Sequence, residues 1–124
     1  MKKLLMLVLV ALMSLGILTA CGGGGGGGAT KEITVEMGAN GEWKFKPDRV
    51  EVNKGDNVKV TLVNKDPAQP HTFVVPALNV KSQQVAANQT STVTFTANTV
   101  GEHDLICDVP GHKDAGMVGK LIVK

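Results

Sequence analysis

The chain has 124 residues, enough for one domain, and its 13 basic and 11 acidic residues give a net charge of +2. No cluster of Lys or Arg stands out, which argues against binding to nucleic acid. Two of the basic residues, Lys2 and Lys3, lie at the extreme N-terminus, and without them 11 basic residues balance 11 acidic ones.

Residues 1–20 have the pattern of a secretory signal peptide. Lys2 and Lys3 precede an apolar run over residues 4–18, which is too short for a comfortable membrane span. The run ends in Leu-Thr-Ala followed by Cys21, which resembles the bacterial lipobox. That resemblance implies cleavage before Cys21 and a diacylglycerol on its sulfur. An ordinary signal peptide and an uncleaved anchor helix are the alternatives.

An unbroken glycine run over residues 22–28 follows Cys21. Glycine has no side chain to bury and high backbone freedom, so residues 21–30 are predicted to be a lipidated cysteine and a flexible tether. The folded domain is then expected over residues 31–124. A disulfide between Cys21 and Cys107 is disfavoured, because lipidation and a metal site would each use one of the two cysteines.

The remaining chain is patterned as β-structure. Apolar and polar residues alternate with a period of two, and Gly, Pro, Asn and Asp separate the runs. This pattern predicts an all-β sandwich or barrel of seven to eight strands. Strands are expected over residues 33–37, 43–46, 50–52, 58–62, 71–75, 90–97, 101–107 and 118–123. Residues 76–89 are the least strand-like, and a loop and a short helix both remain open for them.

The expected core is mostly aliphatic. Tyr is absent, so Val, Ile and Leu must be joined there by Phe45, Phe73, Phe95 and Trp43. We interpret Trp43 as a core residue rather than an electron relay, because large aromatic side chains are mostly buried.

The most informative stretch near the C-terminus places Cys107, His112 and Met117 at the spacing Cys-x4-His-x4-Met. A thiol, an imidazole and a thioether are soft and borderline ligands, which together suit copper. Gly111 and Gly116 directly precede the second and third of these residues, and their backbone freedom suits a tight loop around a metal. Taken singly, each residue has a plain structural explanation, as a buried thiol, a surface imidazole or a core thioether. Their coincidence in this order favours a metal site.

This stretch resembles the ligand loop of the cupredoxins, the small type 1 blue copper proteins that include plastocyanin, azurin and auracyanin. The segment His-Thr-Phe-Val-Val-Pro, which begins at His71, resembles the strand that carries their first histidine ligand. The segment from residue 45 to 58 resembles their early strands, and the similarity as a whole covers residues 33–124. It implies a Greek-key β-sandwich and one type 1 copper ion, with Met117 as the weak axial ligand. The implied ligand set is His71, Cys107, His112 and Met117.

The resemblance also assigns roles around the site. In the family, the second histidine lies near the surface within an apolar patch, and its ring edge is the electron port; the matching residue is His112. The neighbours Pro110, Gly111, Ala115 and Gly116 are small or apolar, which fits transient docking. Asp104, Asp108 and Asp114 are interpreted either as steering charges for a basic partner or as solvated loop charges.

Two positions depart from the family pattern. Thr72 stands where many relatives have an Asn that ties the two ligand loops, so the rigidity of the site is open. His103 stands where relatives often have an aromatic residue. It shares a strand face with Cys107 but lies two pleats away, so we interpret it as structural.

The resemblance implies a membrane-tethered monomer that carries single electrons between redox proteins such as c-type cytochromes or a terminal oxidase. Its expected place is the cell envelope, lipid-anchored to the outer face of the cytoplasmic membrane or in the periplasm. Copper storage or delivery is the alternative, although only Met37 and Met117 follow the signal, too few for a typical transfer site. We do not expect an enzyme, because three His cannot supply a second copper cluster. A binuclear copper site lacks its second Cys, and a zinc site would leave Met117 without a purpose.

Overall fold

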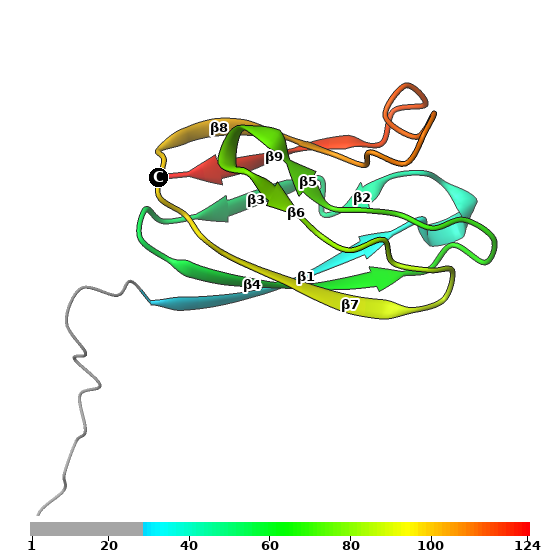
Figure 1. The fold of residues 1–124 in the computed structure, drawn as a ribbon, viewed down its shortest axis with the longest axis horizontal. Coiled ribbons are helices and arrows are strands. Elements are labelled where there is room, and N and C mark those ends of the chain that lie inside the picture. Colours follow the sequence, from blue (N-terminus) through cyan, green and yellow to red (C-terminus); the bar gives the residue numbers. More distant parts are fainter. Residues whose placement is uncertain (1–28) are drawn as a thin grey trace, which may run out of the picture.

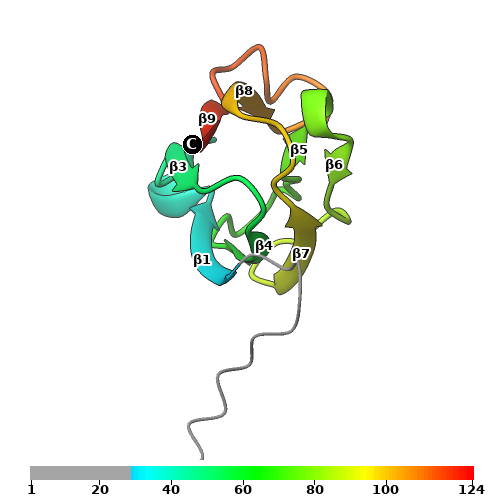
Figure 2. The ribbon, with the colours of Figure 1, turned by 90° about the vertical axis from the view of Figure 1, so that its left-hand side faces the viewer.

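The computed structural model describes residues 29–124, which form nine β-strands in two facing sheets (Figures 1 and 2). The first sheet has the order β2-β1-β4-β7 and the second has the order β3-β9-β8-β5-β6. The strands of the first sheet are β1 (Thr30–Met37), β2 (Phe45–Lys46), β4 (Asn57–Asn64) and β7 (Thr90–Thr96). Those of the second are β3 (Arg49–Val52), β5 (Val74–Val75), β6 (Val80–Lys81), β8 (Gly101–Ile106) and β9 (Val118–Val123).

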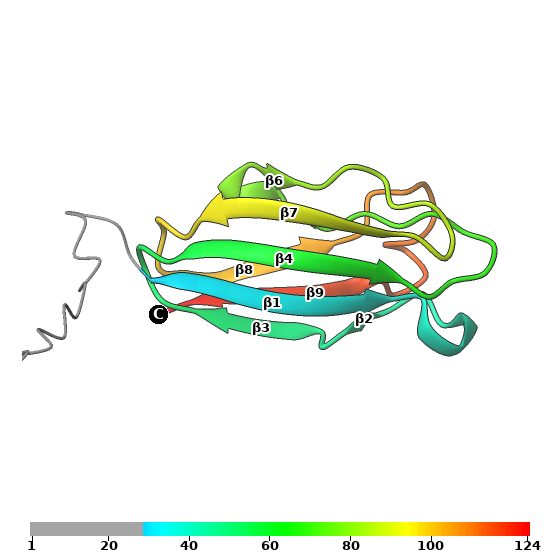
Figure 3. The same ribbon diagram turned by 90° about the horizontal axis from the view of Figure 1, so that it is seen from below.

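Both sheets mix parallel and antiparallel pairs. In the first sheet, β4 pairs in parallel with β1, where Val35 lies opposite Leu62, and antiparallel with β7, where Val60 lies opposite Val93. In the second, β9 pairs in parallel with β3 and antiparallel with β8. The view from below shows β7, β4 and β1 side by side along one face of the sandwich (Figure 3).

The core lies between the two sheets and follows the period of the sequence. Along β4, the inward residues Val58, Val60 and Leu62 are buried, while Asn57 and Lys59, which alternate with them, are exposed. Facing them from the second sheet are Val50, Val52, Leu105, Leu121 and Val123, all buried. Each such side chain contributes about 1.5–3 kcal/mol through burial, which holds the sheets together.

The all-β prediction is confirmed, and the differences are local. The strand expected over 43–46 is limited to β2, so Trp43 lies outside it. In the segment 71–75, His71 makes only an isolated antiparallel bridge with Val85, and the strand proper is β5. The undecided segment 76–89 contains a 3-10 turn, η2 (Pro76–Leu78), and the short strand β6, which accounts for the ninth strand.

The connections that matter for function gather at one end of the sandwich (Figures 1 and 3). They are the β1–β2 turn with η1 (Ala39–Gly41), the β4–β5 and β6–β7 connections and the β8–β9 loop. Over residues 29–124, no helix has the length and apolarity needed to cross a membrane. The predictions for the signal peptide, the lipidated Cys21 and the glycine tether concern residues 1–28, which lie outside the described part of the chain.

Candidate metal centre

The loop of residues 107–117 closes the β8–β9 hairpin at the end of the sandwich where these connections gather. The last strand pair is Ile106 with Val118, so Cys107 and Met117 are the first and last residues of the loop. The backbone N–H of Cys107 donates to the carbonyl of Met117 (3.2 Å), and the N–H of Met117 donates to the carbonyl of His112 (3.0 Å). The hairpin therefore fixes three of the predicted ligands relative to one another.

The two glycines of the loop have the conformation that the sequence suggested. Gly111 has φ 84° and Gly116 has φ 105°, backbone angles that residues with a Cβ rarely adopt. The chain can therefore turn sharply just before His112 and again just before Met117.

His71 reaches the loop from the opposite direction, on the chain between β4 and β5. Its N–H donates to the carbonyl of Val85 (3.1 Å), and its carbonyl accepts from the N–H of Val85 (2.8 Å). This bridge fixes the backbone of His71 although no regular strand includes it. The side chain is fully buried.

Three donor atoms converge on one point. His71 Nδ1 lies 3.0 Å from His112 Nδ1, and Cys107 Sγ lies 3.6 Å from His112 Nδ1 and 3.9 Å from His71 Nδ1. A triangle with these edges surrounds a point about 2 Å from each atom, close to the roughly 2.0–2.3 Å of transition-metal bonds to imidazole nitrogen and thiolate sulfur. The three side chains are buried together and form a cluster able to hold one metal ion.

Met117 completes the set of four. Its side chain is fully buried, in the same core cluster as Cys107. A trigonal His2Cys arrangement with a weak thioether is the donor set of a type 1 copper site. The structure thus brings together all four residues that the sequence singled out.

The surroundings of Cys107 and His112 favour the forms of these side chains that bind a metal. Burial opposes the thiolate of Cys107, but hydrogen bonds from His71, Thr72 and Val109 outweigh it and lower the pKa of this thiol. Burial, together with the nearby charge of His71, lowers the pKa of His112 and keeps its imidazole neutral. Metals bind the thiolate and the neutral imidazole, so less work is needed to deprotonate these groups.

His71 has a carboxylate partner that the sequence analysis did not identify. Its Nε2 lies 3.0 Å from Oδ2 of the buried Asp66, and a carboxylate can only accept, so Nε2 carries the hydrogen and Nδ1 faces the metal. Burial opposes protonation of His71, but hydrogen bonds to Cys107 and Asp66 outweigh it and raise its pKa in the metal-free protein. Such a partner fixes the tautomer and orientation of a ligand imidazole.

The backbone of Gly38 lies directly against the His71–Asp66 pair. A Cβ on Gly38 would lie 2.5 Å from Asp66 Cβ and 2.9 Å from His71 Nε2, and Gly38 has φ 70°. The end of β1 can therefore lie against the His71–Asp66 pair only with glycine at this position.

Thr72 ties the two ligand segments, which resolves the question raised by its departure from the family pattern. Its hydroxyl donates to Asp108 Oδ1 (2.7 Å) and accepts from the Asp108 N–H (2.9 Å). Its backbone N–H also donates to Cys107 Sγ (3.4 Å). The hydroxyl and the backbone N–H of Thr72 therefore both join the segment that carries His71 to the loop that carries Cys107.

His112 is more enclosed than the family resemblance implied. Its side chain is only 2% exposed, whereas a position near the surface was expected. Trp43 stacks on it, with ring centroids 4.1 Å apart and ring planes inclined by 24°. The interpretation of Trp43 as a core residue is therefore incomplete, because the indole packs against the core but also covers a ligand.

The other residues considered in the sequence lie outside the cluster. His103 is hydrogen-bonded to the carbonyl of Thr99 (2.8 Å), which agrees with a structural role. Asp108 pairs with Lys81 (2.8 Å) and Asp104 pairs with Lys120, so two of the three candidate steering carboxylates are already neutralised.

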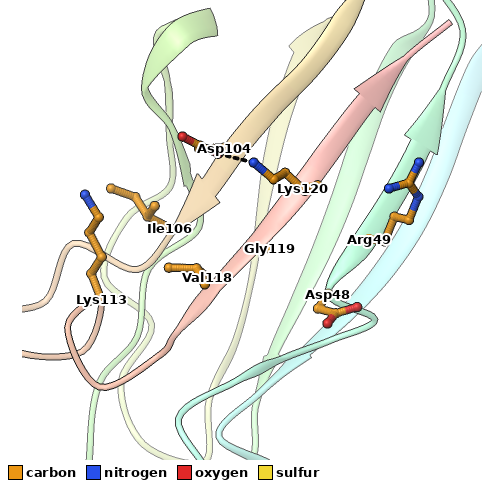
Figure 4. A pocket seen from close by; sticks show the side chains of 8 residues that line it. All are labelled: Asp48, Arg49, Asp104, Ile106, Lys113, Val118, Gly119 and Lys120. Carbon is orange, nitrogen blue, oxygen red and sulfur yellow. Dashed lines mark hydrogen bonds and ion pairs between the residues drawn. The ribbon is translucent and has the colours of Figure 1, made fainter.

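A surface hollow of about 500 Å³ is a different feature from the metal centre (Figure 4). It lies on the outer face of β8 and β9, where the Asp104–Lys120 pair and Val118 line it. None of the four clustered residues contributes to its lining. The hollow therefore offers no route to the donor atoms, which are buried inside the sandwich.

A two-sheet β-sandwich with a buried His-Cys-His-Met cluster at one end defines a blue copper protein. The family model described as "Cupredoxin-like domain" matches residues 5–123, and the chain belongs to this family. The protein accordingly has one type 1 copper site.

Two curated proteins show the relationship in sequence. Auracyanin-A of Chloroflexus aurantiacus is 32% identical over 121 residues, covering 73% of this chain and 74% of that protein. The copper-resistant cuproprotein CopI of Rubrivivax gelatinosus is 26% identical over 115 residues, covering 77% of this chain and 69% of that protein.

The solved structure of auracyanin A, described as a "blue" copper protein from Chloroflexus aurantiacus, superposes with a TM-score of 0.70. The two are 26% identical, and the match covers 77% of this chain and all of that one.

Proposed function

We propose that this protein is a mononuclear electron carrier that cycles one copper ion between Cu(I) and Cu(II). The observation that carries the proposal is the convergence of Cys107, His71 and His112 on one buried point. A thiolate, two imidazoles and a thioether are acceptable ligands to both oxidation states. The ligands are held by a rigid framework, so that little has to move when the charge of the ion changes.

The rigid framework consists of bonds already described. The β8–β9 hairpin fixes Cys107 and Met117, the bridge to Val85 and the carboxylate of Asp66 fix His71, and Thr72 ties the two segments. An enzyme would need an open position for substrate on the metal, whereas the donor atoms here are buried on all sides. We therefore propose no catalytic activity.

Spectroscopy of the copper-loaded protein tests the proposal. We expect an intense visible thiolate band that bleaches on reduction and returns on oxidation, and rapid electron exchange between copies of the protein. Cys107→Ser should abolish the band, whereas Thr94→Ala should leave it unchanged, because Thr94 is exposed and pairs with Lys59 toward the opposite end of the sandwich. A colourless protein, or a coloured one that exchanges electrons slowly, would contradict the carrier role.

Copper handling in the envelope is the second candidate, and the similarity to a copper-resistant cuproprotein favours it. The two roles differ in how readily the metal leaves. A carrier should retain Cu(I) against a competing chelator through many redox cycles, whereas a delivery protein should transfer it to an apo-acceptor.

We also propose that the protein is exported and held at the membrane by a lipid on Cys21, and that it acts as a monomer on redox proteins of the envelope. The lipobox-like Leu-Thr-Ala before Cys21 supports the anchor, and the glycine run after it would let the domain reach a partner. Cys21→Ser should move the protein from the membrane fraction to the aqueous fraction while its colour is retained. Unchanged membrane association of this variant would contradict lipidation.

A further inference from the structure

Among residues 29–124, Trp43 is the one Trp or Phe ring that stacks on a histidine of the metal centre, and it is only partly buried. It is the only Trp of the chain and lies between η1 and β2. Its indole stacks on the His112 imidazole at 4.1 Å. No strand includes it, but its backbone lies in a turn closed by the Lys44 N–H, which donates to the Glu42 carbonyl (2.9 Å).

The four clustered residues offer almost nothing to a docking protein. His71, Cys107 and Met117 have no exposed surface, and His112 has 2%. A partner that approaches this end of the sandwich therefore meets the indole rather than a ligand. The stacked rings are in van der Waals contact, so the indole continues the path from the metal site outward without a gap.

We propose that Trp43 is the electron-transfer contact of this protein, through which a redox partner exchanges electrons with the copper site by way of His112. This proposal rests on the carrier function proposed above. One electron leaves the reduced site and is accepted by the oxidised partner, and no proton moves. The indole supplies contact and orbital overlap, and it is itself neither oxidised nor reduced.

The surroundings of Trp43 indicate the kind of partner. Its neighbours Glu42 and Lys44 are exposed and pair with each other (3.8 Å), so their charges cancel locally. The exposed loop residues around His112 are mostly uncharged, namely Pro110, Gly111, Ala115 and Gly116. Among the charged ones, Lys113 and Asp114 are adjacent and of opposite sign, so together they add no net charge to this face. The fitting partner is a redox protein whose cofactor lies beneath an apolar, weakly charged face, with Trp43 as the central anchor.

The test compares Trp43→Leu and Trp43→Phe with the wild-type protein, each loaded with copper. The control is Val100→Ala, an exposed apolar residue between β7 and β8, at the opposite end of the sandwich from the ligand loop. For each protein we would record the visible and spin-resonance spectra, the reduction potential and the rate of electron exchange between its Cu(I) and Cu(II) forms.

With spectra and potential unchanged, we expect Trp43→Leu to slow exchange by about tenfold or more, equivalent to about 1.4 kcal/mol of barrier. Trp43→Phe, which keeps a stacked ring, and Val100→Ala should stay within about threefold of the wild type, a barrier change of under about 0.7 kcal/mol. An unchanged or faster rate in Trp43→Leu would overturn the proposal, as would equal slowing in Trp43→Phe. Slow exchange in the wild-type protein would instead overturn the carrier function itself.

Fluorescence gives a second readout that does not depend on the exchange rate. Because Trp43 is the only indole and stacks on a ligand ring, we expect Cu(II) to quench its emission strongly and reduction to restore part of it. Emission that is insensitive to Cu(II) would place the indole away from His112 and overturn the proposal.

Discussion

The metal centre has two sides, each of which supplies one histidine, and the two histidines are held in position by different kinds of contact. The strand side, residues 64–72, holds His71 through a buried polar network. The loop side, residues 107–117 together with Trp43, holds His112 by a backbone turn and a stacked ring. Hydrogen bonds set the position of the first imidazole, whereas packing covers the second.

The strand side is the more heavily bonded of the two. The buried Asn64 donates from Nδ2 to the carbonyls of Gln69 (2.9 Å), Val85 (2.9 Å) and Ala86 (3.2 Å). Its Oδ1 accepts from the N–H of Asp66 (2.9 Å), and Asp66 in turn accepts from the N–H groups of Ala68 and Gln69. The strand side thus fixes the position of His71, and the loop side remains available for contact with a partner.

The largest expected effect tests whether stability resides on the strand side. Asn64→Ala removes the side-chain amide, which donates hydrogen bonds to three backbone carbonyls and accepts one from a backbone N–H. The free energy of unfolding of the metal-free protein should therefore fall by about 3 kcal/mol. Asn57→Ala, also on β4 but exposed, and Lys113→Ala on the loop side should each change it by less than about 0.5 kcal/mol. Urea unfolding measures all three. Equal losses in Asn64→Ala and Lys113→Ala would refute the asymmetry.

A smaller loss is expected where the two sides are joined. Thr72→Val keeps the shape of the side chain but removes the hydroxyl that bonds twice to Asp108, and it should cost about 1–2 kcal/mol of unfolding free energy. Thr72→Ser retains the hydroxyl and serves as the control. The thiolate band should persist in Thr72→Val, because the backbone N–H that meets Cys107 Sγ remains. Wild-type stability in Thr72→Val would mean that the hydroxyl does not tie the segments.

The charge of Asp66 distinguishes the two sides electrostatically. Burial opposes ionisation of Asp66, but hydrogen bonds from Ala68, Gln69 and His71 lower the pKa of this carboxyl, so it stays ionised near neutral pH. A negative charge next to a ligand stabilises Cu(II) over Cu(I), so Asp66→Asn should raise the reduction potential by on the order of 50 mV. Asp114→Asn, which removes an exposed carboxylate of the loop side, should leave it nearly unchanged. Matching shifts in a redox titration would count against a special role for Asp66.

The smallest expected effect concerns salt. Several charges around the loop side are paired, as Asp108 with Lys81 and Glu42 with Lys44. The adjacent Lys113 and Asp114 have opposite signs, so long-range steering should be weak. Raising the ionic strength from about 0.01 to 0.1 M, which shortens the screening length from about 30 to 10 Å, should change the exchange rate by less than about twofold. Lys81→Gln leaves Asp108 without its partner and should make the rate more dependent on salt. A steep dependence in the wild type would indicate a charged docking face instead.

The strand prediction succeeded where the period of two was long and failed where flanking residues limited pairing. Residues 57–64 form a strand close to the expected range, because alternating side chains meet a core on one face only. Residues 118–123 also form the expected strand, although Leu121, Ile122 and Val123 are buried in succession. His71 lies between Pro70 and the short β5, and the pairing of its backbone with Val85 is non-local, so the sequence could not give its length or partner.

The sequence by itself indicated three of the four donors and the class of site, because the chemistry of Cys107, His112 and Met117 and their spacing are local properties of one loop. The fourth donor, His71, was assigned only through the family resemblance. Only the tertiary structure decided what surrounds the donors. The turn after β4 aims the carboxylate of Asp66 at His71, and the β1–β2 connection places Trp43 over His112 from far along the chain. Such contacts depend on how the two sheets bring distant loops together at one end, and no periodicity or spacing within a segment encodes that arrangement.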